Sequence, residues 1–215
     1  MNITQTKRKL VEICHRVYAN GFVAGYEGNL SVRAGREMVL VTPARVCKGD
    51  VTVRDLVTID RKKARSRTSG HRPPARRPTA ELEMHLMVYD ARSDVEAVVH
   101  AHPPVATGFA VAGVPIPERA LPEVIVTMGA IPLVPYAMPG TAELADAIRE
   151  YVTRANAFLL SNHGVLTVGR TIEEAYYRME TVEQVAMSVL AARVLGEPLQ
   201  LSDAQIAALE KLIER

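Results

Sequence analysis

The chain has 215 residues, of which 48% are hydrophobic and 23% charged, and its formal net charge is +2. These values are typical of one sizeable globular domain and exclude a fibrous or disordered chain. The sequence contains no apolar signal core and no window near the roughly 18 uninterrupted apolar residues of a membrane span. Because its two cysteines, Cys14 and Cys47, form no CxxC pattern, we expect a cytoplasmic protein without a disulfide framework.

The positive charge is concentrated in one segment. Residues 61–77 contain eight Lys and Arg and no acid, whereas the rest of the chain carries 18 bases and 24 acids. The segment has no aromatic residue and is interrupted by Gly, Pro and Ser, so we interpret it as a solvated loop. A rim that attracts an anionic small molecule is the second interpretation. We expect no nucleic-acid partner.

The N-terminal half predicts one helix, three short strands and a second helix. Apolar residues at helical spacing predict a helix over 4–20, which Gly21 would end. Alternating or short apolar runs predict strands over 30–33, 38–41 and 56–59. After the basic segment, Thr79 is expected to cap a helix over 80–89, whose first turn holds Glu81 and Glu83.

The C-terminal half alternates strands with helices. A β-branched run predicts a strand over 95–102, and the two prolines after it suit the first turn of a helix over 105–112. Further strands are predicted over 124–127, 131–134, 157–161 and 165–168, with a helix over 141–153 between them. Capping boxes at Thr171 and Ser202 predict a long helix to Leu195 and a terminal helix. Together these elements predict a single layered α/β domain covering residues 1–215.

Three histidines stand at the ends of predicted core strands. His100 and His102 share a face of their strand, about 6.6 Å apart along it. Taken alone, such a pair is more often bonded to backbone or water than to a metal. His163 follows another buried strand, and Gly164 allows a sharp turn beside it. The three could fill three tetrahedral positions and leave one open, as in catalytic zinc sites.

A carboxylate near the open position would complete a metal-assisted acid/base site. Glu81, at a predicted helix N-terminus, is the best placed, although spacing alone leaves Glu83, Glu96 and Glu123 as competitors. His85, four residues after Glu81, could also bind the metal. We interpret it instead as a partly buried histidine on a core-facing helix.

Six segments resemble those of one known family in order and spacing. They are GNLSVR (28–33), VTP (41–43), PTAE (78–81), VVHAH (98–102), PY…GT (135–141) and NHG (162–164). Over about residues 5–210 the chain therefore resembles the class II aldolases. This family includes L-fuculose-1-phosphate aldolase, the adducin head and ribulose-5-phosphate 4-epimerase.

The resemblance implies a three-layer α/β fold with a central, largely antiparallel sheet, assembled as a homotetramer with active sites at subunit interfaces. It implies that His100, His102 and His163 bind a divalent metal, most often Zn²⁺, with Mn²⁺, Co²⁺ and Fe²⁺ as alternatives. Glu81 matches the catalytic acid/base, where epimerases of the family carry aspartate. The positions that match phosphate binding are Gly28, Asn29, Ala44, Arg45, Thr79 and Ala80.

The reaction implied is cleavage of a ketose 1-phosphate, of the fuculose, 5-deoxypentulose or methylthiopentulose type, into dihydroxyacetone phosphate and an aldehyde. The chain departs from the fuculose-phosphate enzymes at Ala44-Arg45 and Thr79-Ala80, where it loses two hydroxyls and gains a guanidinium able to hold a phosphate or a carboxylate. Leu121 replaces a tyrosine proton donor, and no C-terminal tyrosine is present. There are two alternatives. One is a dehydratase or decarboxylase of a related sugar phosphate, and the other is a non-catalytic adducin-like interaction protein.

Overall fold

A single sheet runs through the middle of the molecule. The computed structural model describes residues 2–65 and 76–213. Within these residues seven strands pair in the order β3-β2-β1-β4-β7-β6-β5, and every pair is antiparallel except β5 with β6. The strands are β1 (Asn29–Arg33), β2 (Met38–Val41), β3 (Val57–Asp60), β4 (Ala97–Ala101), β5 (Leu133–Val134), β6 (Ala157–Leu160) and β7 (Gly164–Gly169). The predicted single α/β domain with a largely antiparallel sheet is confirmed.

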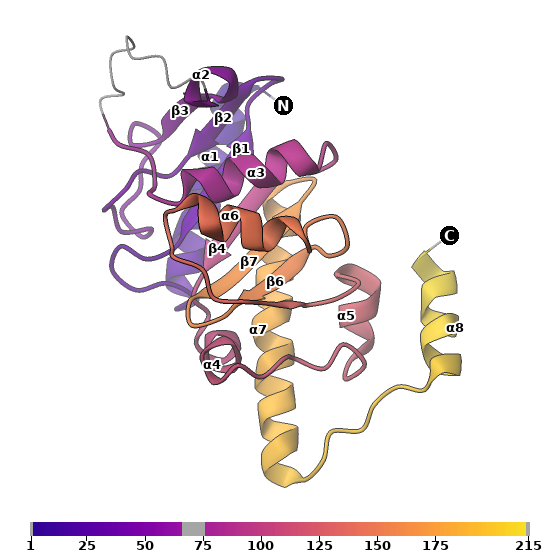
Figure 1. Cartoon of the computed structure of the whole chain (residues 1–215). Helices are drawn as coiled ribbons and strands as arrows, with labels where there is room; N and C mark the ends of the chain where they lie inside the picture. The colour runs from indigo at the N-terminus through magenta and orange to yellow at the C-terminus, as the bar shows by residue number, and fades with distance from the viewer. Residues whose placement is uncertain (1, 66–75, 214–215) are drawn as a thin grey trace.

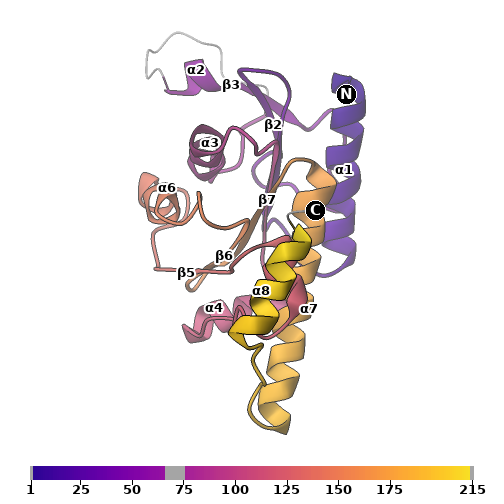
Figure 2. The same ribbon diagram turned by 90° about the vertical axis from the view of Figure 1, so that its right-hand side faces the viewer.

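Helices cover both faces of this sheet. Figure 1 shows α3 and α6 in front of the sheet, and the view turned by 90° in Figure 2 shows α1 and α7 on the opposite face. Three layers result, as the sequence predicted. The helices are α1 (Ile3–Ala19), α2 (Arg61–Arg65), α3 (Leu82–Ala91), α4 (Pro104–Ala112), α5 (Pro122–Thr127), α6 (Ala142–Arg149), α7 (Ile172–Leu195) and α8 (Asp203–Ile213).

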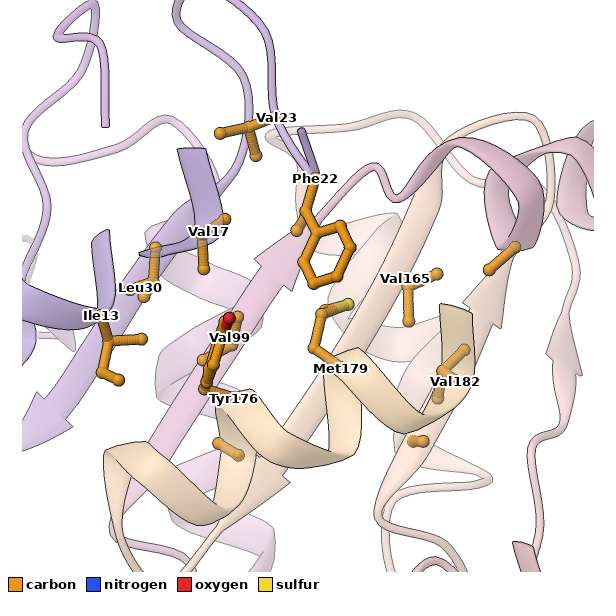
Figure 3. Close-up of a cluster of buried hydrophobic side chains, with 14 of the residues drawn as sticks. Ile13, Val17, Phe22, Val23, Leu30, Val99, Val165, Tyr176, Met179 and Val182 are labelled. Carbon is orange, nitrogen blue, oxygen red and sulfur yellow. The ribbon is translucent and has the colours of Figure 1, made fainter. Parts of the chain in front are cut away.

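An apolar core lies on each face of the sheet. Neighbouring side chains of a strand point to opposite faces, so Val99 enters the core beneath α1 and α7, whereas Val98 enters the core beneath α3 and α6. Figure 3 shows the first core, where Ile13 of α1 and Met179 of α7 pack towards Val99. Each buried side chain of this kind stabilises the fold by roughly 1.5–3 kcal/mol. These two cores hold β4 rigidly between β1 and β7.

The fold brings three distant segments together at one end of β4. Asn29, the first residue of β1, pairs with His100 near the end of β4. On the other side of β4, Ala101 pairs with Val165 at the beginning of β7. The turn between β6 and β7, which contains His163, therefore lies beside the end of β4.

The strand predicted over 124–127 is wrong, because Pro122–Thr127 forms helix α5. Four consecutive β-branched residues suggested a strand, but Pro122 has the fixed φ that suits a first helical turn. Only Val124 of this helix is buried, as expected for a short helix with one face on the core. The strand predicted over 131–134 is shortened to Leu133–Val134.

Two further details differ from prediction. Helix α3 begins at Leu82 with Glu81 as its N-cap, and Thr79 Oγ1 accepts a hydrogen bond from the Glu81 N–H at 3.3 Å. Thr79 is therefore not the cap. The basic segment 61–77 begins with helix α2 (Arg61–Arg65) rather than a loop, and its residues 66–75 lie outside the described residues. Among the described helices, none is both long enough and apolar enough to cross a membrane.

Candidate active site

Three histidine side chains converge at the end of β4. The nitrogens that His100, His102 and His163 can offer to a metal all lie within 4.8 Å of one another. The Nε2 atoms of His100 and His102 are 3.2 Å apart. The cluster combines His100 of β4 and His102 directly after this strand with His163 of the β6–β7 turn, and the sequence predicted that these three would meet.

A hydrogen bond sets the tautomer of His100. Its ring is fully buried, and its Nδ1 lies 2.9 Å from the carbonyl oxygen of Val165. Because a carbonyl only accepts, Nδ1 carries the hydrogen and the lone pair of Nε2 faces the cluster. Burial lowers the pKa of His100 to about 3, so the ring is neutral at physiological pH. Neutral imidazole is the form that binds a metal.

His163 is presented by a sharp turn that packs closely against β4. Asn162 adopts a left-handed conformation with φ of 54°. A Cβ atom at Gly164 would lie 2.4 Å from Cδ2 of His102 and 2.7 Å from the carbonyl oxygen of Ala101. Glycine is therefore required at position 164 by close approach to β4, and Gly164 itself lies within β7 rather than in the turn. Burial lowers the pKa of His163 as well.

Glu81 directs its carboxylate at the histidines. Its Oε1 lies 3.2 Å from His163 Nε2, and its Oε2 lies 3.3 Å from His100 Nε2. Asn29 Nδ2 donates a hydrogen bond of 2.7 Å to Oε2. Among the described residues, the buried Oε1 of Glu81 and Nδ1 of His163 have no hydrogen-bond partner. Neutral imidazole nitrogens and one carboxylate form a donor set that fits a divalent transition metal such as zinc.

The electrostatic surroundings of Glu81 favour its ionised form. Burial by itself would raise the pKa of this carboxyl. The hydrogen bond from the Asn29 amide stabilises the charged form, and the pKa of Glu81 lies below its ordinary value. Glu81 is therefore a carboxylate at neutral pH, in position to accept a proton.

Glu27, which no sequence pattern singled out, lies beside the outer nitrogen of His102. Its Oε2 is 3.5 Å from His102 Nδ1 and accepts a hydrogen bond of 3.1 Å from the Ala24 N–H. Carboxylates commonly orient histidines that bind metals in this way. The neighbouring Gly28 has φ of +65°, and a Cβ there would lie 2.8 Å from the His100 carbonyl oxygen. Gly28 thus lets the loop carrying Glu27 approach β4.

A second group of predicted residues lines a basic groove. Segments 42–44 and 77–79 are joined by hydrogen bonds from Ala44 N to Arg77 O at 3.0 Å and from Thr79 N to Thr42 O at 3.2 Å. Thr79 is buried, whereas Arg45 is exposed with φ of 58°. Arg76 and Arg77, from the basic segment whose second interpretation was a rim for an anionic small molecule, join the groove. Its lining is Ala44, Arg45, Arg76, Arg77, Pro78 and Ala80.

The three competing carboxylates lie outside the histidine cluster. Glu83 lies in a groove between α3 and α6, Glu96 precedes β4 at the end away from His100, and Glu123 belongs to α5. Leu121 precedes α5 and packs against the core beneath α7. His85 is also outside the cluster, and it is fully rather than partly buried. Its contacts lead to Asn29 instead.

The comparisons with known proteins agree on one family. The family model of the class II aldolase and adducin N-terminal domain matches residues 8–190. A solved structure of an L-fuculose 1-phosphate aldolase has a TM-score of 0.86 and 27% identity, with 98% of this chain and 97% of that chain covered. The fold of that enzyme therefore extends over nearly all of this chain.

Three curated relatives differ in their reactions. L-fuculose phosphate aldolase of Methanococcus maripaludis is 32% identical, covering 82% of this chain and 91% of the relative. The 5-methylthioribulose-1-phosphate/5-deoxyribulose-1-phosphate aldolase of Rhodospirillum rubrum is 33% identical, covering 88% and 82%. The 3-oxo-tetronate 4-phosphate decarboxylase of Haemophilus influenzae is 28% identical, covering 95% of each chain. The chain belongs to the class II aldolase and adducin family, whose aldolases are metal-dependent lyases.

Proposed function

We propose that this protein is a divalent-metal-dependent aldolase that cleaves a ketose 1-phosphate into dihydroxyacetone phosphate and an aldehyde. The observation that carries the proposal is the Glu81 carboxylate, held 3.2–3.3 Å from two members of a cluster of three histidines. Only one carboxylate of the four candidates is so placed. We further propose that the protein acts in the cytoplasm as a homotetramer.

His100, His102 and His163 would hold the metal, with Zn²⁺ as the first choice and Mn²⁺, Co²⁺ or Fe²⁺ as alternatives. When bound, the ion would supply an electrophile that stabilises the negative charge developing on the substrate oxygens. Neutral histidine ligands suit this purpose because they leave the full positive charge of the ion. The hydrogen bond to the Val165 carbonyl keeps the hydrogen on Nδ1 of His100, so the lone pair of Nε2 remains available for a metal ion.

Glu81 would move the proton at C3 of the substrate. Cleavage breaks the C3–C4 bond, its electron pair remains with the three-carbon fragment, and protonation of C3 then completes dihydroxyacetone phosphate. A buried carboxylate beside the cluster can carry that proton. The C4 hydroxyl must lose its proton to form the aldehyde. We propose that Glu123 or a water molecule accepts this proton.

The basic groove would bind the phosphate. Arg45, Arg76 and Arg77 surround small side chains in the groove, and guanidinium groups bind phosphate oxygens bidentately. Arg76 also pairs with Asp55 at 2.7 Å, so Arg45 and Arg77 are the stronger candidates. Gly28, Asn29, Ala44, Thr79 and Ala80 complete the proposed substrate-binding set.

Product analysis with a panel of ketose 1-phosphates tests the proposed reaction. The panel contains fuculose 1-phosphate, 5-deoxyribulose 1-phosphate and 5-methylthioribulose 1-phosphate, and the product measured is dihydroxyacetone phosphate. Glu81→Gln is expected to retain the metal and lose most turnover, by about 100-fold or more. A Glu81→Gln protein with the wild-type rate would show that Glu81 is not the acid/base.

A metal-dependent decarboxylase or dehydratase of a related sugar phosphate is the second candidate. Two observations favour it. Leu121 has no hydroxyl to serve as proton donor, and Arg45 could bind a substrate carboxylate as well as a phosphate. Incubation with an oxo-acid phosphate would release carbon dioxide without dihydroxyacetone phosphate in this case. A purified protein that takes up no added zinc would instead favour an adducin-like interaction role.

A further inference from the structure

A buried chain of hydrogen bonds ends at the Glu81 carboxylate. Tyr89 Oη and Ser31 Oγ are 2.8 Å apart, and Ser31 Oγ lies 2.6 Å from His85 Nδ1. His85 Nε2 lies 2.5 Å from Asn29 Oδ1, and Asn29 Nδ2 lies 2.7 Å from Glu81 Oε2. Four consecutive contacts therefore connect the core beneath α3 to the candidate acid/base.

The spacing of residues along α3 and β1 brings these hydrogen-bonded side chains together. Glu81, His85 and Tyr89 recur every fourth residue, so they share one side of α3. Asn29 and Ser31 are two residues apart, so they share one face of β1. The two rows interdigitate where α3 packs on the sheet.

The carboxylate end sets the direction of every hydrogen bond. Asn29 Nδ2 donates to Glu81 Oε2, so the Oδ1 of the same amide faces His85 and accepts from it. His85 Nε2 must then carry the hydrogen. Nδ1 of a neutral ring accepts, so the Ser31 hydroxyl donates to it and in turn accepts from Tyr89. Every donor in the chain thus points towards Glu81.

The side chains of this hydrogen-bonded row lie in the protein interior. Ser31 and His85 are fully buried, and Tyr89 is 2% exposed. Burial lowers the pKa of His85 to about 4 and raises the pKa of Tyr89, so both side chains are neutral. A buried polar row is costly unless all its groups are paired. Here each group has its partner within the row, so the row holds His85 and Asn29 in one orientation.

We propose that His85 is a positioning residue for Glu81: by donating to Asn29 it fixes the amide that orients the carboxylate towards the histidine cluster. Ser31 and Tyr89 hold His85 in the required tautomer. This inference rests on the proposed acid/base role of Glu81, although the tautomer of His85 can be measured whatever the reaction is.

The first test measures that tautomer by ¹⁵N NMR of protein labelled at histidine, with and without added zinc. His85→Gln identifies the His85 signals by their loss. The expected result is a neutral ring with hydrogen on Nε2 between pH 6 and 8. A ring with hydrogen on Nδ1, or a ring that is protonated in this range, would overturn the proposal even if the protein proves to be an aldolase.

The second test compares three substitutions of His85 in the zinc-loaded protein. The Gln amide reaches the place of Nε2 and can donate to Asn29, whereas the Asn amide reaches only the place of Nδ1, and Leu has no donor. His85→Leu and His85→Asn should lower kcat about 10- to 100-fold, as loss of an orienting partner does elsewhere. KM should change little, and His85→Gln should recover most of the turnover.

The outcomes separate the possible failures. Equal losses in all three folded variants would mean that ring packing matters rather than donation to Asn29, and wild-type rates in all three would mean that His85 does not position Glu81. Either result overturns the inference. Zinc content and the melting temperature identify variants that fail to fold. If wild-type protein cleaves no ketose 1-phosphate, the proposed function fails while the NMR test still decides the tautomer.

Discussion

Close packing against His102 and Ala101 requires a glycine at position 164. A Cβ there would lie 2.4 Å from His102 Cδ2 and 2.7 Å from the Ala101 carbonyl oxygen. Neither neighbour can move freely, because Ala101 is a buried strand residue and His102 donates its backbone N–H to Phe22 O at 2.8 Å. A single methyl group would therefore displace His102 from the cluster.

We predict that Gly164→Ala weakens zinc binding by at least about tenfold and destabilises the fold by about 1–3 kcal/mol. Zinc titration and denaturant unfolding would measure the two effects. Gly108→Ala is the matched control, because Gly108 is exposed within α4 and a Cβ there meets no atom within 4 Å. This control should be neutral or stabilising by up to about 1 kcal/mol. Equal zinc affinities in the wild-type and Gly164→Ala proteins would contradict the prediction.

Because His85 is buried in its neutral form, the stability of the folded protein should depend on pH. The pKa of His85 falls from an ordinary 6.5 to about 4 on folding. Between these values the unfolded chain binds a proton that the folded chain does not, so the free energy of unfolding should fall as pH falls from 6.5 to 4. The contribution of His85 to this fall is about 3 kcal/mol.

Chemical unfolding at several pH values, with a chelator present, measures this contribution as the difference between the wild-type and His85→Gln proteins. The wild type should lose more stability than the variant across this window. The other histidines titrate in both proteins and cancel. Parallel pH curves would show that His85 is not buried in its neutral form.

Helix α7 anchors the helix that follows the histidine cluster. The Glu183 carboxylate accepts hydrogen bonds from Val105 N at 3.0 Å and Ala106 N at 2.8 Å, at the N-terminus of α4. This end of α4 has no side-chain cap of its own, since Pro103 occupies the N-cap position. A buried carboxylate from another helix therefore satisfies amides directly after His102 and complements the helix dipole.

We predict that Glu183→Ala destabilises the protein by about 2–4 kcal/mol, because two buried amides lose a charged acceptor. Glu183→Gln should cost less, since one amide oxygen remains available. Thermal and denaturant unfolding measure both changes. Gln184→Ala, an exposed neighbour on the same helix, should stay within about 0.5 kcal/mol of wild type. A loss as small for Glu183→Ala as for Gln184→Ala would disprove the capping role.

In the molecule as a whole, one side of α7 carries apolar side chains that the described residues leave about half or more exposed. Met187 is 48% exposed, Leu190 47% and Val194 80%. Their spacing of three and four residues places them on one stripe of the helix. Contiguous exposed apolar surface commonly marks a site of association, which supports the proposed homotetramer.

We predict that Met187→Lys combined with Leu190→Lys lowers the molecular mass measured by light scattering from that of a tetramer to that of a smaller species. Buried charges without partners would oppose association. Ile3→Lys, an exposed apolar position on α1, is the control and should leave the mass unchanged. A monomeric wild-type protein would refute the tetramer. An unchanged mass in the double variant would show that the subunits associate through another surface.

The family, the layered and largely antiparallel fold, and the meeting of the three histidines with Glu81 were predictable from the sequence. They were predictable because His100, His102, His163 and Glu81 belong to short motifs of chemically restricted residue types at the ends of elements. Most elements were also predictable, since caps, breakers and periodicity act locally. The helix at Pro122–Thr127 was the main exception, because β-branched residues favour strands locally while packing selected a helix.

The contacts of the remaining polar groups became clear only from the three-dimensional arrangement of the elements. His85 contacts Asn29 and Ser31, more than 50 residues away, because α3 packs on β1 in one particular register. The same holds for Glu183, whose carboxylate reaches α4 across the core, and for Arg77, which joins the groove of Ala44 through a backbone hydrogen bond. Such contacts depend on the relative placement of distant elements, which cooperative packing determines and local sequence patterns do not encode.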